Sequence, residues 1–243
     1  MKYAALTVLL LANSAFANGL DDLKAALVPL QGQGALRGTY EAREQKSDAE
    51  KPGAKPELAQ LSAQVEDDAG GLQLRWERAL LKRAADEAKG GKRNAVLERA
   101  ISANSGMRVA ESVNYAPKLL RMLANSQLTL ERADTWQGKP ARLLELKITP
   151  PVEADEKTKV KENTVLAQVW LGADGVPLGA TLSQKLKISM MAFLSIERAS
   201  KDEFSFAVHA NRLVLLRREE QGSDKNIGGE VVFRNLYTFM PKG

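Results

Sequence analysis

The apolar and polar positions between Thr164 and Met240 alternate with a period of two. Within Leu178–Ile188 the even positions are apolar or small apart from Gln184, and the same phase returns in Phe204–Ala210. Successive side chains of a strand point to opposite faces of a sheet, so this period predicts strands with one dry and one solvated face. Antiparallel sheets commonly have this asymmetry. The pattern therefore predicts a mainly antiparallel β protein.

Further alternating segments extend the predicted sheet to about ten or eleven strands, enough for a strongly twisted sheet to curl. The first strand, Ala35–Glu44, has Leu36, Gly38, Tyr40 and Ala42 on its inward face. The other segments are Leu58–Glu66, Leu72–Trp76, Gln127–Leu130, Ala141–Thr149, Thr164–Leu171, Leu213–Glu219 and Glu230–Phe239. Segments that are charged or rich in Gly and Pro predict loops or turns, at Gln45–Glu57, Pro150–Asn163, Ser200–Glu203 and Gln221–Gly229.

The period changes to that of a helix between residues 77 and 125, which reads as a helical excursion from the sheet. Arg78–Lys89 and Ala95–Ser102 each place apolar residues on one face, and Asn114 could cap a third helix. Asn18–Leu30 also has leucines at helical spacing. We therefore expect an α+β protein in which about three helices cover a curved sheet.

The N-terminus has the three parts of a secretory signal peptide in the required order. A short cationic start, Met1-Lys2-Tyr3, precedes the apolar run Ala4–Leu11 and the small-x-small site Ala15-Phe16-Ala17. The run is too short to span a bilayer, which needs about 20 apolar residues, although a buried N-terminal helix is an alternative. We predict cleavage after Ala17, export to the periplasm, and one mature domain at 18–243 with no transmembrane segment.

Composition narrows the possible functions. The sequence has no cysteine, which excludes disulfide bonds and thiolate chemistry. Its 35 basic and 30 acidic residues are interspersed, and few aromatics accompany the basic ones, so nothing indicates a nucleic-acid partner.

The sequence nominates no catalytic apparatus. It contains no glycine-rich phosphate loop, no Gly-x-Ser-x-Gly elbow and no His-Glu-x-x-His motif. His209, the sole histidine, lies on the predicted wet face of its strand, so we expect it at the surface and expect no metal site. Trp76, Trp136 and Trp170 could line a pocket, although hairpin or core packing is the simpler interpretation. We expect a protein that is not an enzyme and needs no cofactor.

Two stretches carry a family resemblance. Ala116–Pro151 contains a helix and hairpin with the step Gly138-Lys139-Pro140-Ala141, and Val165–Gln184 leads through Trp170 into the turn Asp174-Gly175-Val176-Pro177-Leu178. These stretches resemble the periplasmic lipoprotein-carrier superfamily, which includes LolA, LolB and RseB. The resemblance implies a half-open antiparallel β-barrel with lid helices, an apolar space for acyl chains between them, and Arg37 as a candidate for holding the lid.

The apolar stretch Met190–Ile196 could be a doubly buried strand or a ligand wall, since methionines suit adaptable binding surfaces. We hypothesise a soluble periplasmic protein that binds a lipid or the acyl part of a lipoprotein. The alternative is an RseB-like envelope module that binds a protein partner and has a filled core. The residues predicted to line a ligand cavity are Leu119, Leu123, Leu178, Leu182, Met190 and Phe193.

Overall fold

The structure is a computed structural model that describes residues 18–32, 34–51, 53–91, 95–150, 158–190 and 194–242. Its helices are α1 (Gly19–Leu27), the 3-10 helix η1 (Val28–Leu30), α2 (Arg78–Lys89), α3 (Val96–Ala103), α4 (Gly106–Val113) and α5 (Ala116–Ala124). Its strands are β1 (Leu36–Asp48), β2 (Glu57–Asp68), β3 (Gly71–Trp76), β4 (Ser126–Trp136), β5 (Lys139–Ile148), β6 (Thr158–Leu171), β7 (Pro177–Met190), β8 (Leu194–His209), β9 (Arg212–Asn226) and β10 (Gly229–Lys242).

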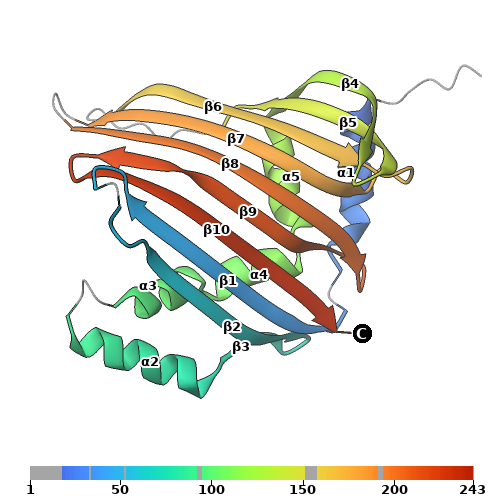
Figure 1. Cartoon of the computed structure of the whole chain (residues 1–243). Helices are drawn as coiled ribbons and strands as arrows, with labels where there is room; N and C mark the ends of the chain where they lie inside the picture. The colour runs from blue at the N-terminus through green and yellow to red at the C-terminus, as the bar shows by residue number, and fades with distance from the viewer. Residues whose placement is uncertain are drawn as a thin grey trace, which may run out of the picture.

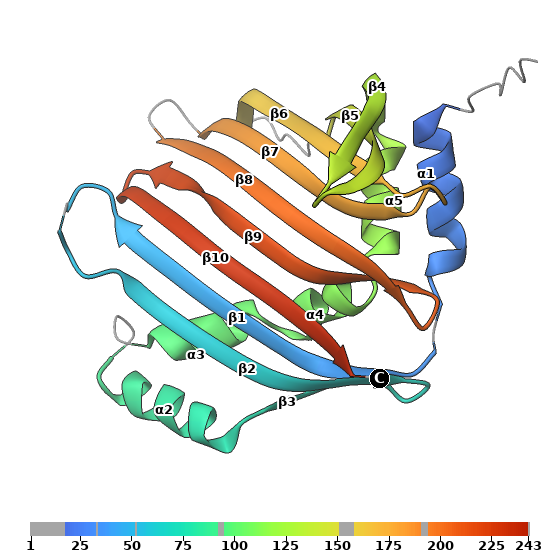
Figure 2. The same cartoon turned by 45° about the vertical axis from the view of Figure 1, so that its right-hand side comes forward.

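The ten strands form one antiparallel sheet in the order β3-β2-β1-β10-β9-β8-β7-β6-β5-β4. The sheet is curved and open, and α3, α4 and α5 lie behind it in Figures 1 and 2. We call the face toward the helices the inner face and the opposite face the outer face. The far end is where β1 connects to β2, β7 to β8 and β9 to β10, on the left in Figure 1. The predicted curved sheet with covering helices is confirmed.

Two separate hydrophobic cores join the helices to the inner face. In the first core, leucines of α1 and α5 pack against inward side chains of β5 to β9, such as Leu144, Val169 and Phe204. In the second core, α2, α3 and α4 pack against β1, β2 and β10 around Tyr40 and Phe239. The predicted inward rows of the strands supply most of both cores.

Close approach of a tryptophan explains one glycine in the sheet. A Cβ added at Gly179 of β7 would lie 2.1 Å from the ring of Trp136. That ring also packs against Trp170, with the ring centroids 4.7 Å apart, and the Trp170 Nε1 donates a 3.2 Å hydrogen bond to Asp134. Because Ala180 points inward, Gly179 and the two tryptophans pack on the outer face.

Several strands are longer than predicted, and one helix was missed. Strand structure continues through Gln45–Asp48, Thr158–Asn163, Ser200–Glu203 and Gln221–Asn226, all of which were predicted to be loops or turns. The described residues form five α-helices including α4, rather than about three. The proposed cap at Asn114 is wrong: Asn114 ends α4, and α5 follows Tyr115 with Pro117 in its first turn.

Candidate functional site

A row of polar side chains crosses the inner face between the two cores. Asp202 of β8 pairs in register with Glu220 of β9, which pairs with Asn235 of β10, which pairs with Glu44 of β1. All four residues are buried, with 4–8% of their surface exposed. Buried polar groups need partners, so the neighbours of this row decide whether it stabilises the sheet.

Two arginines neutralise the carboxylates of this row. The Nε of Arg218 donates to Asp202 Oδ1 over 2.7 Å, and Arg198 donates to Glu220 over 2.9 Å. Burial raises the pKa of the Asp202 carboxyl above its ordinary value, although the nearby Arg218 opposes this rise. Burial also opposes the charge on Arg218, but Asp202 and Glu220 outweigh it and raise the pKa of Arg218. Asn235 completes the pairing by donating to Glu220 over 3.1 Å.

The other end of the row ties the sheet to the helices. Asn104, which follows α3, accepts a 2.7 Å hydrogen bond from the hydroxyl of Tyr40 and donates a 2.8 Å bond to Glu44. Arg108 of α4 donates a 2.7 Å bond to the hydroxyl of Tyr237. Burial raises the pKa of both tyrosines, so both hydroxyls keep their protons at neutral pH. These bonds fix the helical excursion on the sheet.

A shallow hollow of about 160 Å³ opens beside this row on the inner face. Its lining includes Lys46, Arg108, Arg198 and Asp224 and is therefore charged rather than apolar. The Oδ1 atom of Asn235 is buried nearby without a hydrogen-bond partner among the described residues. We interpret the charged row mainly as a structural link between the two cores.

Beyond the row, toward the far end, the inner face carries apolar side chains that belong to neither core. Leu186 and Ile188 lie on β7. Ile188 is paired in register with Ile196 of β8 on one side and with Val160 of β6 on the other. We call these four residues the inner apolar strip. Three are half-buried and Ile196 is 40% exposed, so the strip offers apolar surface to a ligand.

The structure places the predicted ligand-lining residues in different surroundings. Leu119 and Leu123 of α5 are buried in the first core, Leu182 packs against its edge, and Leu178 is half-buried at the start of β7. Met190 is the last residue of β7, and Phe193 lies outside the described residues. Met190 is therefore the member that stands nearest in sequence to the strip, because it follows Ile188 at the end of β7. The ligand-lining role of all six stays a prediction.

Three other residues from the sequence argument have clear positions. Arg37 of β1 is exposed and donates a 2.7 Å hydrogen bond from its Nε to Glu66 of β2. Its parity is opposite to that of the inward Tyr40, which puts it on the outer face, and a role in holding the lid stays a prediction. His209 is exposed, as expected. Trp76 packs against the second core, in agreement with the packing interpretation.

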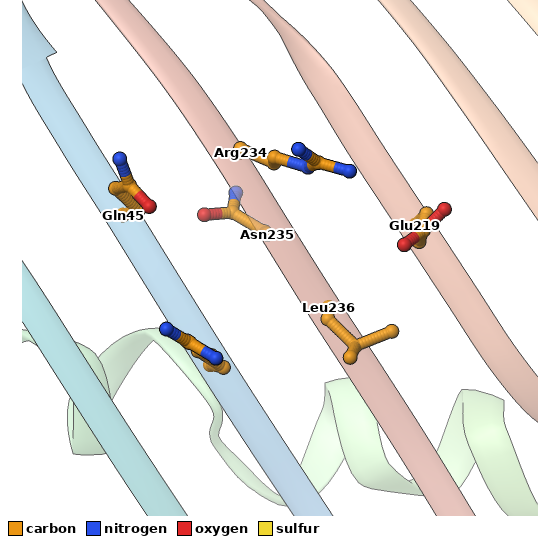
Figure 3. A pocket seen from close by; sticks show the side chains of 6 residues that line it. Gln45, Glu219, Arg234, Asn235 and Leu236 are labelled. Atoms are coloured by element: carbon orange, nitrogen blue, oxygen red, sulfur yellow. The ribbon is translucent and has the colours of Figure 1, made fainter.

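The outer face carries a different hollow, of about 250 Å³, between β1, β10 and β9. Figure 3 shows its side chains with the helices behind the strands: Gln45, Arg234, Glu219 and Leu236 surround it together with Arg43. The structure gives neither Arg43 nor Arg234 an ion-pair partner among the described residues. Sequence reasoning did not find this surface, because its charged residues occupy the solvated phase of ordinary strands.

Comparisons with known proteins place this chain in no family. No family model matches it, and the search of curated proteins finds no match. One solved structure, "Crystal structure of MucB in complex with MucA(peri)", is similar over 90% of this chain and 93% of that chain, with 9% identity and a TM-score of 0.25. A likeness at this level carries no argument, so membership of the lipoprotein-carrier superfamily stays a prediction.

Two further features are absent from the described residues. Among those residues, no helix has the length and apolar character needed to cross a membrane. Within the same part of the chain, no three His, Asp or Glu side chains gather in a way that could hold a metal ion.

Proposed function

We propose that this protein is a periplasmic binding protein that holds a lipid, or the acyl part of a lipoprotein, on the inner face of its sheet. The observation that carries the proposal is the inner apolar strip, which continues the phase of core residues such as Ala180 beyond the reach of both cores. An acyl chain lying along β7 would cover Leu186 and Ile188 and gain about 0.8 kcal/mol for each methylene removed from water.

A charged pair beside the polar row sets one boundary of this binding surface. Arg198 and Asp224 pair across β8 and β9 in the same register row as Leu186, so a ligand headgroup would meet charged groups there. The acyl chain would then extend from this pair toward the far end. This arrangement supports an amphiphile rather than a fully apolar molecule.

Native mass spectrometry of the protein purified from the periplasm tests the proposal, followed by organic extraction of bound material. We expect one lipid per chain, and we expect Leu186→Glu and Ile188→Glu to remove it. Leu81→Glu is the matched control, because Leu81 is 45% exposed on α2 and belongs to neither core. A bare protein that also forms no adduct with added fatty acid or phospholipid would contradict the proposal.

A second candidate is a module that binds an envelope protein. The specific observation in its favour is the packing of α5, since Leu119 and Leu123 expose only 5% and 1% of their surface where a carrier would keep ligand space. Under this alternative the same strip would bind an apolar segment of the partner. Cross-linking of the periplasmic protein at Ile196→Cys would then capture a single protein rather than lipid.

A further inference from the structure

The outer face of β5 to β10 is strongly basic in the half toward the far end. One register row runs from Lys147 through Lys201 to Arg234, and five more lysines lie between that row and the far end. We call these residues the outer basic face: Lys147, Lys159, Lys161, Lys185, Lys187, Lys201, Lys225 and Arg234. All point away from the cores, because their strand neighbours such as Leu146, Asp202 and Phe233 point inward.

Acidic side chains neutralise only part of this charge. Glu162, Glu197 and Glu230 share these rows, so eight cations and three carboxylates leave a formal charge of +5. Among the described residues, the structure gives only Lys187 an ion-pair partner, namely Glu197. Lys187, Lys225 and Lys161 act together on Glu197 and lower the pKa of its carboxyl. The sequence of segment 151–157 contains three acidic residues and one lysine. If all four charges are added to those of this face, its formal charge is still +3.

The shape of this surface indicates what kind of anion it fits. Six strands spaced by about 4.8 Å make it roughly 24 Å wide, and six residues along β7 make it about 20 Å long. Among the helices that the structure describes, none covers this face in Figures 1 and 2. An extended acidic peptide would cover only a small part of such a width, whereas a broad array of phosphates would contact several of the strands at once.

The residue types support the same partner. Seven of the eight cations are lysines, which act as point charges toward phosphate, and these rows include no aromatic side chain for stacking on bases. Two exposed apolar side chains, Leu166 at 52% and Val232 at 46%, lie on the same face and could enter a headgroup layer. We propose that the outer basic face docks this protein reversibly on a membrane surface rich in anionic phospholipid.

Vesicle co-sedimentation of the mature protein tests this docking. Vesicles of equal parts phosphatidylglycerol and phosphatidylcholine should bind it, and phosphatidylcholine alone should not. A juxtamembrane lysine contributes about fivefold in affinity, so the triple variant Lys185→Gln, Lys201→Gln, Lys225→Gln should bind roughly a hundredfold more weakly. Raising the salt to about 0.5 M should release the wild type, because it shortens the Debye length to a few ångströms.

The matched control is Lys82→Gln, Lys89→Gln, Lys139→Gln, which changes the net charge equally at exposed positions away from this face. It should bind like the wild type.

Equal weakening of both triple variants, or equal binding to neutral vesicles, would overturn the proposal. Binding to soluble poly-glutamate without binding to vesicles would overturn it in favour of an acidic protein partner. Lipid adducts on the inner face, detected by native mass spectrometry, should be unchanged in the triple variant, so the two proposals can fail separately.

Discussion

Substitution of Gly179 by alanine tests the packing of the outer face near the β4–β5 hairpin. The added Cβ would lie 2.1 Å from Cζ2 and 2.3 Å from Cε2 of Trp136. Carbon atoms prefer about 3.5–4.0 Å, so the indole must move by more than 1 Å or leave its site. Such a movement separates Trp136 from Trp170, whose ring centroid lies 4.7 Å away.

The expected cost follows from these contacts. Overpacking costs typically 1–3 kcal/mol, and loss of an aromatic pair accounts for about 0.5–1.5 kcal/mol of that range. We therefore expect Gly179→Ala to lower the free energy of unfolding by about 2 kcal/mol, or to lower Tm by about 4–8 °C. Urea unfolding followed by tryptophan fluorescence measures both the loss and the change around the two indoles.

Two further variants decide whether the cause is this contact. Gly106→Ala adds the same methyl group where no atom lies within 4 Å, so it should be neutral or stabilising by less than about 1 kcal/mol. In a Trp136→Ala background, Gly179→Ala should cost almost nothing, because the ring that it strikes is gone. An undiminished loss in that background would refute the explanation, as would a loss below about 0.5 kcal/mol in the wild type.

The buried polar row gives three more predictions. Arg218→Met leaves Asp202 and Glu220 buried with less counter-charge and should cost about 3–5 kcal/mol in urea unfolding; a loss under 1 kcal/mol would mean that water reaches them. The raised pKa of Asp202 makes the folded state bind its proton more tightly, so this residue's contribution to stability grows as pH falls through that pKa. The stability of wild type relative to Asp202→Asn should therefore rise toward acid pH, and a constant difference would refute this. Asn104→Ala removes the acceptor of the Tyr40 hydroxyl and the shorter of two hydrogen bonds to Glu44, and it should cost about 2–3 kcal/mol. Asn125→Ala at an exposed site should change stability by under about 0.5 kcal/mol.

Hydrophobic alternation predicted the sheet well wherever the inward phase is apolar. Leu36, Tyr40 and Ala42 of β1 and Phe204 and Phe206 of β8 are buried as expected. The helix predicted at Arg78–Lys89 has the same bounds as α2. The repeat of apolar residues is sufficient to predict these elements, because burial of apolar side chains decides both the type of element and which of its faces points inward.

The same rule failed where the inward residues are polar. Asp202 and Glu220 each continue the inward phase of their strands, but a carboxylate in that position resembles a loop residue to a rule based on hydrophobicity. Their partners, chiefly Arg218 and Arg198, come from neighbouring rows of other strands. Such pairing is visible only once the register is known, which is why the strands were predicted too short.

The two candidate surfaces could likewise be predicted only in part. Alternation placed Leu186 and Ile188 on the inner face, but it could not show that the helices would leave them outside both cores. The sequence did not predict the outer basic face, because lysines at solvated positions are common in any single strand. Only the alignment of six strands brings Lys147, Lys201 and Arg234 into one row.

The pairing of β1 with β10 has a consequence for how the chain folds. Arg37 lies opposite Lys242, so this pair of inner strands joins segments about two hundred residues apart, whereas the other pairs are hairpins or near neighbours in sequence. Closing so long a loop is entropically unfavourable and slow compared with forming local hairpins. The strands β4 to β10 and the unit of β1 to β3 with α2 to α4 can therefore form first, each with an unpaired edge. Pulse-labelled hydrogen exchange should protect the amides between β1 and β10 last, and until that seam closes β1 and β10 are the places where two copies of the chain could pair wrongly.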